Sequence, residues 1–113
     1  MAKWRPPRQP GKMNKTEALY EATILEARRQ AGEITRWNYE GLTFRLGLDR
    51  KTTYTPDFVI FLAAGEIELV DVKGGGGWEP HTRIKIKTAA RIWPEFHWVG
   101  ELYRRGVWTR EEF

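Results

Sequence analysis

The sequence predicts a single domain of the α/β class, with a mixed central β-sheet flanked by helices. Three observations carry this prediction. The elements expected along the chain run helix, several strands, helix and strand, without an internal repeat. The continuous apolar run 58–63 is typical of a strand that is buried on both faces. The chain of 113 residues is long enough for one domain with a modest core, and six Trp, five Phe and four Tyr supply material for it.

The first predicted helix covers residues 14–31. Asn14 suits the N-cap position, and Glu17 follows at the three-residue spacing of a capping box. Apolar residues then recur at helical spacing, and Gly32 is a typical residue at the end of a helix.

Strands are expected over 35–40 and 42–48, the second because its apolar residues alternate strictly. The runs 58–63 and 66–73 are separated by the tight turn Ala64-Gly65. These two runs are therefore expected to pair as a β-hairpin.

The remainder of the chain predicts a loop, a helix and two closing strands. The run Gly74–Gly77 favours a flexible loop. Apolar residues at helical spacing predict a second helix over about 80–93, which Pro94 would end. The segments 96–100 and 101–108 are expected to form strands.

The net charge of +4 is distributed unevenly. Residues 1–15 hold five basic side chains and no acidic one, so the rest of the chain carries a small net negative charge. We expect residues 1–13 to form a flexible basic arm ahead of a domain that covers 14–113. A basic arm suits a polyanion such as nucleic acid, and a solubilising leader is the alternative.

Composition also excludes several classes of protein. The chain has no cysteine, which excludes disulfides and thiolate metal sites, and its two histidines argue against a histidine-rich metal site. No apolar run reaches membrane-spanning length, and no signal-peptide pattern is present at the start. The expected location is therefore the cytoplasm, without a membrane partner.

Three charged side chains stand where the predicted hairpin would bring them together. Asp57 begins one strand, and Asp71 and Lys73 end the other. The start of one hairpin strand lies beside the end of its partner, and residues two apart share a face. Two adjacent carboxylates repel each other, and a hard cation such as Mg²⁺, for which Mn²⁺ would substitute, removes that conflict. A bound cation activates water and neutralises a phosphate, and Lys73 could hold or deprotonate the attacking water.

Pro56-Asp57 and Asp71-Val72-Lys73 resemble the signature of the PD-(D/E)xK nuclease superfamily. The segments "NKTEALYE", "YTPDFVIF", "LVDVKG" and "RIKIKTAA" look like those of small phage-encoded nucleases related to Holliday-junction resolvases. The resemblance implies a restriction-endonuclease-like core in the order α-β-β-β-α-β, and it covers most of the chain. A phage-encoded member would act in the cytoplasm of its bacterial host.

The resemblance also implies a metal site for phosphodiester hydrolysis. Asp57, Asp71 and the carbonyl of Val72 would bind the ion. Many members add a glutamate from the first helix, and Glu17 fits that place, although a helix cap explains it as well. In related nucleases a polar residue of the later helix assists at the active site, and Lys85 is the candidate here.

DNA contacts are expected from basic side chains. Arg83, Lys87 and Arg91 recur every four residues on the second helix, as either a phosphate-tracking stripe or an ordinary solvated face. Three further candidates lie outside that helix: Lys12, Lys15 and Trp78. The tryptophan could stack on an unpaired base or only anchor the loop that precedes it.

The expected function is therefore hydrolysis of DNA by a magnesium-dependent endonuclease. By resemblance, branched DNA is the preferred substrate and DNA recombination the setting. Symmetric cutting of a junction needs two active sites, so a homodimer is expected. Two alternatives remain: a non-catalytic DNA-binding protein on a nuclease fold, and an exonuclease or restriction-type nuclease.

Overall fold

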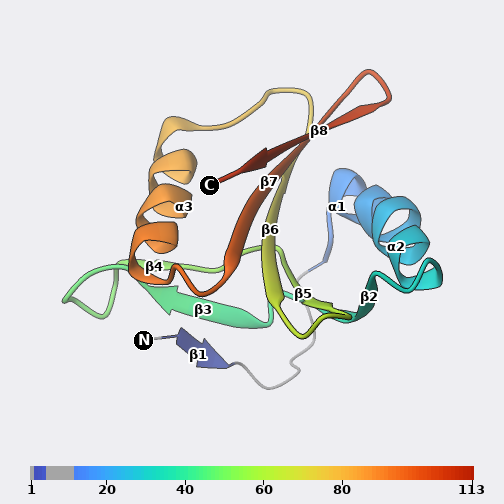
Figure 1. The fold of residues 1–113 in the computed structure, drawn as a ribbon. Coiled ribbons are helices and arrows are strands. Elements are labelled where there is room, and N and C mark those ends of the chain that lie inside the picture. Colours follow the sequence, from blue (N-terminus) through green and yellow to red (C-terminus); the bar gives the residue numbers. More distant parts are fainter. Residues whose placement is uncertain (1, 5–11) are drawn as a thin grey trace.

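The computed structural model describes residues 2–4 and 12–113 and has a mixed α/β architecture. A five-stranded sheet in the order β2-β5-β6-β7-β8 forms its centre. Helices α1 and α2 lie on one face of this sheet and α3 on the other (Figure 1). The strands of the sheet are β2 (Ile34–Tyr39), β5 (Phe58–Leu62), β6 (Ile67–Lys73), β7 (His97–Arg104) and β8 (Val107–Glu112).

The central sheet is antiparallel except at one pair of strands. β2, β5 and β6 pair in antiparallel fashion, which confirms the predicted β5–β6 hairpin. Helix α3 (Pro80–Ile92) then connects β6 to β7, which lies parallel to β6, and β8 closes the sheet as an antiparallel edge strand. A crossover helix of this kind is what a parallel pair requires.

A smaller sheet lies below α3, in the order β1-β3-β4 (Figure 1). It is formed by β1 (Ala2–Trp4), β3 (Leu42–Arg45) and β4 (Thr53–Tyr54). Part of the expected basic arm thus pairs with β3 as a strand. The other residues of the arm, apart from those at 12 and 13, lie outside the described part of the chain.

The first helical segment begins as the sequence predicts. Asn14 accepts a hydrogen bond from the Glu17 backbone N–H, and the Glu17 carboxylate accepts one from the Asn14 N–H, so the capping box is formed. A π-helical turn, η1 (Glu21–Leu25), separates α1 (Lys15–Tyr20) from α2 (Glu26–Gln30). Because of this turn, Tyr20 and Leu25 are both buried against the sheet although they are five residues apart.

The sheet separates two apolar cores, because alternate residues of each strand point to opposite faces. Phe58 and Val70 pack under α1, η1 and α2, whereas Val59 and Leu69 pack toward α3. The run at the start of β5 is buried on both faces, as predicted.

Two strand predictions are wrong in their extent. The expected strand 42–48 ends at Arg45, and Leu48 is fully exposed, because the chain turns where Asp49 accepts a hydrogen bond from the Thr52 N–H. The expected strands 96–100 and 101–108 are one continuous strand, β7, followed by a tight turn at Arg105-Gly106 and by β8.

A buried cluster of ion pairs lies under α1 and α2. Glu68, 3% exposed, accepts hydrogen bonds from Arg28 and Arg110. Although burial opposes the effect, these two guanidinium groups lower the pKa of Glu68. Nearby, the Tyr20 hydroxyl donates a hydrogen bond to Glu101, and burial raises the pKa of Glu101.

No helix in the described part of the chain is long and apolar enough to cross a membrane.

Candidate active site

A cavity of about 280 Å³ opens on the α3 side of the central sheet. It lies between β4, the beginning of β5, the end of β6 and the first turns of α3. Its lining residues are Thr53, Tyr54, Thr55, Asp57, Asp71, Lys73, His81, Thr82 and Lys85. Four of the residues selected from the sequence, from three separate segments, thus border the same space.

The register of the hairpin brings Asp57 and Asp71 together. Phe58 pairs with Val70 in the antiparallel ladder, so the next position places Asp57 opposite Asp71. The Val72 N–H donates a hydrogen bond of 2.8 Å to Asp57 Oδ2, and the Asp57 carbonyl accepts one from the Glu40 N–H. These two bonds hold Asp57 between neighbouring strands.

Both carboxyl groups are held in an environment that disfavours their charge. Asp71 is 4% exposed, and burial raises its pKa, although the Lys73 ammonium lies 3.7 Å from Asp71 Oδ2. Burial and the charge of Asp71 raise the pKa of Asp57 to about 9. In the absence of a cation, the pair therefore holds a proton at neutral pH.

Tyr54 is a site residue that sequence analysis did not select. Burial, together with the neighbouring carboxylates of Asp71 and Asp57, raises its pKa well above the ordinary value. The hydroxyl therefore stays protonated and can act only as a neutral donor or acceptor beside the two carboxyl groups. The two-residue strand β4, on which Tyr54 lies, resembles a turn in the sequence.

Two lysines border the acidic pair from different elements. Lys73 extends from the end of β6 and is one-third exposed, whereas Lys85 lines the cavity from α3. His81, in the first turn of α3, also lines the cavity, and its Nε2 lies 3.0 Å from Glu79 Oε2. No pattern in the sequence distinguishes this histidine from an ordinary surface residue.

Glu17 is near the acidic pair but does not line the cavity. Its Oε1 accepts hydrogen bonds of 2.9 Å from both the Asn14 N–H and the Tyr39 hydroxyl. Its charge contributes to the raised pKa of Asp57 and Asp71, behind the larger effect of burial. In this structure Glu17 therefore acts as the helix cap and as the hydrogen-bond acceptor of Tyr39, and its role as a metal ligand stays a prediction.

The donor set fits a hard divalent cation that keeps water ligands. Within 2–4 and 12–113, no group of three His, Cys, Asp or Glu side chains could hold a metal ion. The pair of carboxyl groups nevertheless includes a buried oxygen, Asp71 Oδ2, that has no hydrogen-bond partner among the described residues. The Val72 carbonyl lies on the same side of its strand as the N–H that reaches Asp57. One or two carboxylates completed by water and substrate oxygens are the usual ligands of Mg²⁺.

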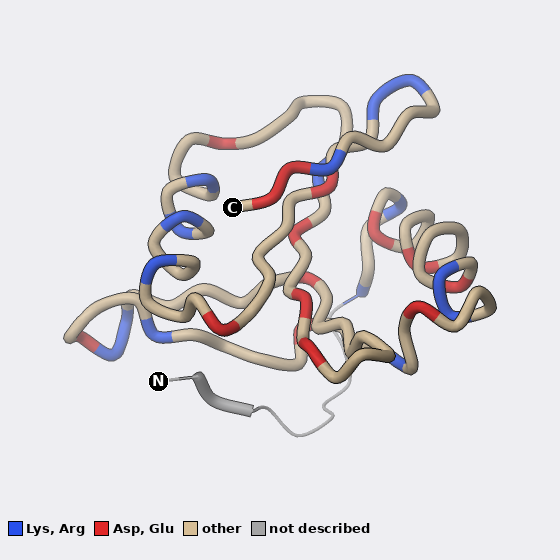
Figure 2. Tube along the Cα trace, in the orientation of Figure 1, with Lys and Arg blue, Asp and Glu red and all other residues tan. Residues whose placement is uncertain are grey.

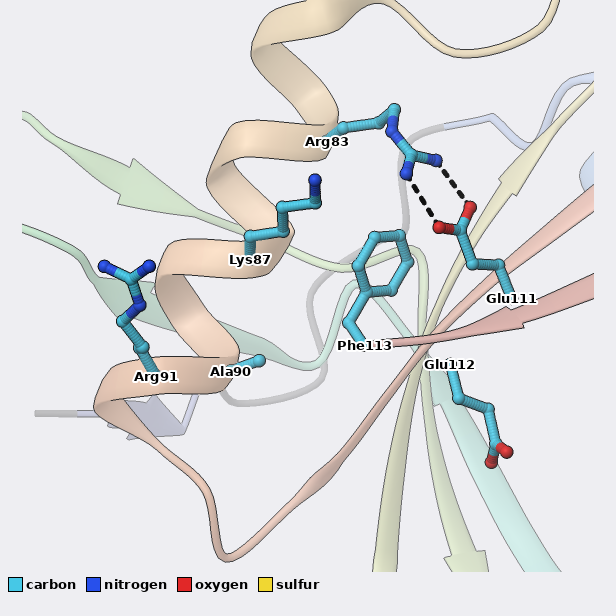
Figure 3. Close-up of a pocket in the computed structure, with 7 residues that line it drawn as sticks. All are labelled: Arg83, Lys87, Ala90, Arg91, Glu111, Glu112 and Phe113. Carbon is cyan, nitrogen blue, oxygen red and sulfur yellow. Dashed lines mark hydrogen bonds and ion pairs between the residues drawn. The ribbon is translucent and has the colours of Figure 1, made fainter.

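The basic face of α3 is only partly available to a ligand. The Arg83 guanidinium binds the Glu111 carboxylate through both Nη atoms, at 2.5 and 2.7 Å (Figure 3). Lys87 and Arg91 are exposed and border a cavity of about 500 Å³ between α3 and the end of β8. Lys87 and Arg91 remain candidates for phosphate contacts, whereas Arg83 would first have to leave Glu111.

Trp78 packs against the sheet. Its ring covers Gly100, where a Cβ would lie 2.7 Å from the ring, and it is half-buried beside the α3-side core. This position supports the interpretation of Trp78 as the anchor of the glycine loop. Lys12 and Lys15 are exposed at the start of the first helix.

Comparisons with protein-family models, with curated proteins and with solved structures found no match for this chain.

Proposed function

We propose that this chain is a metal-dependent DNA endonuclease with a restriction-endonuclease-like fold. The observation that carries the proposal is the position of Asp57, Asp71 and Lys73 around one cavity, although the two aspartates are 14 positions apart. The sequence resemblance to PD-(D/E)xK nucleases rests on the same three residues.

The arrangement of elements supports the proposal. The helical segment α1–α2 precedes the antiparallel strands β2, β5 and β6, and α3 then leads to the parallel strand β7. This is the α-β-β-β-α-β order that the resemblance implies, with β1, β3 and β4 forming an additional small sheet.

The proposed reaction is attack of water on a backbone phosphorus, which breaks one phosphorus–oxygen bond and nicks the strand. A divalent cation held by Asp57, Asp71 and the Val72 carbonyl would lower the pKa of a bound water and neutralise charge on the phosphate. Lys73 holds the attacking water or stabilises the negative charge that develops on phosphorus-bound oxygens. Lys85, on α3, provides a second cation for the phosphate.

The proposed substrate is branched DNA, which follows from the likeness to junction resolvases. The sequence shows no motif of a separate sequence-reading module, which agrees with recognition of DNA shape rather than of base sequence. A symmetric pair of cuts needs two active sites, and we therefore propose that the active form is a homodimer.

A cleavage assay with a plasmid and a synthetic four-way junction tests this function. In Mg²⁺ the protein should nick DNA, and EDTA should abolish the reaction. Asp71→Asn and Lys73→Ala should each remove cleavage while junction binding is kept. The matched controls Asp49→Asn and Lys51→Ala, on an exposed turn whose residues do not line the cavity, should cleave like the wild type.

The outcomes separate the three interpretations. Nicking of both substrates that depends on Asp71 and Lys73 supports the endonuclease. Binding without any cleavage supports a DNA-binding protein, and digestion from linear ends alone supports an exonuclease. Full turnover by both variants would refute the assignment of the site.

A further inference from the structure

The hairpin tip between β7 and β8 lies beside the glycine loop that follows the candidate active site. Gly75, Arg104 and Arg105 line a cavity of about 610 Å³. The tip and the loop stand at the same end of the sheet (Figure 1). In the parallel β6–β7 register Lys73 pairs with Leu102, so Arg104, two residues further on, is on the same face of the sheet as Lys73.

Arg104 and Arg105 give this hairpin tip a positive charge. Neither Arg104 nor Arg105 has an ion-pair partner among the described residues. Basic residues gather at this tip and along α3, whereas acidic residues follow the central strands (Figure 2). The Arg104 guanidinium also lies close to the loop, because a Cβ on Gly77 would lie 2.8 Å from its Nη2.

The glycine loop has free backbone donors next to this cavity, which Gly75 lines. A Cβ added at Gly75 or at Gly76 would meet no atom within 4 Å, so the space beside them is open. Their N–H groups donate no hydrogen bond within the described part of the chain. Consecutive free N–H groups next to cationic side chains form a typical concave site for an anion.

The backbone at the tip holds a residue that the turn does not favour. Arg105 has φ of 50° and is followed by Gly106 with φ of 81°, which is a two-residue turn with both residues in the left-handed region. Asn, Asp or Gly is the usual first residue of such a turn, because other side chains crowd the backbone there. An arginine at this position, facing an open cavity, points to a contact outside the fold.

We propose that Gly75, Gly76, Arg104 and Arg105 form a second phosphate-binding subsite, which holds the DNA backbone to one side of the scissile phosphate. This inference rests on the proposed function for the identity of its ligand. The subsite extends the path of the DNA from Lys73 across the glycine loop to the hairpin tip. A side chain at Gly75 would project into open space next to the cavity that Gly75 lines, and it would therefore compete with a phosphate bound there.

The test measures DNA affinity without catalysis. A short fluorescent duplex is titrated with the full chain in EDTA at several potassium chloride concentrations. Each lost phosphate contact should reduce the slope of log K against log salt by about 0.9 and weaken binding about fivefold at physiological salt. The variant Arg104→Gln/Arg105→Gln loses two contacts and should therefore reduce the slope by about 1.8 and weaken binding about 25-fold. The matched double variant Arg50→Gln/Lys51→Gln, on the exposed β3–β4 turn, should leave the slope unchanged.

A second variant separates binding from folding. Asparagine tolerates the left-handed conformation, so Arg105→Asn should keep or raise the melting temperature while it weakens DNA binding about fivefold. In the cleavage assay with Mg²⁺, the arginine variants should raise KM and leave kcat unchanged, because the reacting groups are intact.

The subsite and the nuclease can fail separately. If the chain binds duplex DNA and the Arg104/Arg105 variant keeps the full salt slope, the subsite is wrong, whether or not DNA is cleaved. If the Arg50/Lys51 control loses as much salt slope as the Arg104/Arg105 variant, only total charge matters and the subsite is wrong. The subsite is also wrong if the wild type does not bind DNA. If the slope falls as expected but no cleavage occurs, the subsite stands and the nuclease proposal fails.

Discussion

Replacing Asp57 with asparagine should stabilise the metal-free protein at neutral pH, although the change removes a proposed metal ligand. Burial and the charge of Asp71 raise the folded-state pKa of Asp57 to about 9. A group with a raised folded-state pKa stabilises the fold while it is protonated. This contribution is complete below about pH 4 and is lost as the pH rises through the folded-state pKa. The asparagine amide has no charge to bury, and its oxygen can still accept the Val72 N–H.

The magnitude follows from the pKa shift. Neutral pH lies about three units above the ordinary aspartate pKa, and each unit corresponds to about 1.4 kcal/mol. The free energy of unfolding that the variant gains at neutral pH therefore has an upper bound of about 4 kcal/mol. The cavity beside Asp57 admits water, which screens its charge, and we therefore expect about half of this value. A gain of about 2 kcal/mol raises the melting temperature of a domain of this size by about 8 °C.

Thermal unfolding followed by circular dichroism, in EDTA and between about pH 4 and pH 8, measures this effect. The Asp57→Asn variant should melt above the wild type at neutral pH, and the two should converge toward about pH 4. Added Mg²⁺ should raise the melting temperature of the wild type and have little effect on the variant. A variant that melts at or below the wild-type temperature throughout this range would refute the reasoning.

Asp49→Asn is the matched control, with the opposite sign. Hydrogen bonds from the Thr52 backbone N–H and hydroxyl lower the pKa of Asp49 on the protein surface. A lowered folded-state pKa stabilises the fold above the ordinary pKa, and this contribution is lost as the pH falls. This variant should therefore gain nothing at neutral pH.

Two further predictions concern stability, one from packing at the glycine loop and one from the buried ion pairs. A Cβ on Gly74 would lie 2.8 Å from Thr16 Oγ1, so Gly74→Ala should lower the free energy of unfolding by about 1 to 2 kcal/mol, and adding Thr16→Ala should restore most of it in urea denaturation. Glu68→Gln leaves the buried side of Arg110 without a full counter-charge and should cost about 3 kcal/mol in the same assay. Glu112→Gln, which removes an exposed partner of Arg110, should change stability by less than about 0.5 kcal/mol, and equal losses in the two variants would contradict this account.

The central hairpin and its acidic pair were predictable because local rules determine both. A tight turn, two apolar runs and the pairing register together place Asp57 opposite Asp71, and no information from distant segments is needed. Tyr54 was not predictable in this way. Its strand is two residues long, and only the smaller sheet places it beside Asp71.

The wrong predictions come from apolar patterns that a local turn or a distant contact overrides. Apolar alternation continues to Leu48, but a hydrogen-bonded turn at Asp49 ends the strand before it. The predicted boundary between the strands 96–100 and 101–108 falls inside β7, where the missing side chain of Gly100 makes room for the Trp78 ring. The pairing of Arg83 with Glu111 depends on how the edge strand β8 lies against α3, which no local pattern specifies.

The π-helical turn at Glu21–Leu25 lets one helical segment contact two separate parts of the sheet. Before the turn, Glu17 is oriented toward Tyr39 and the end of the sheet that carries the acidic pair; after it, Arg28 reaches Glu68 at the other end. A regular helix with one residue fewer would rotate these two stretches by about 100° relative to each other. The inserted residue therefore sets the rotation of one stretch of the helix relative to the other, so that both Glu17 and Arg28 face their partners on the sheet.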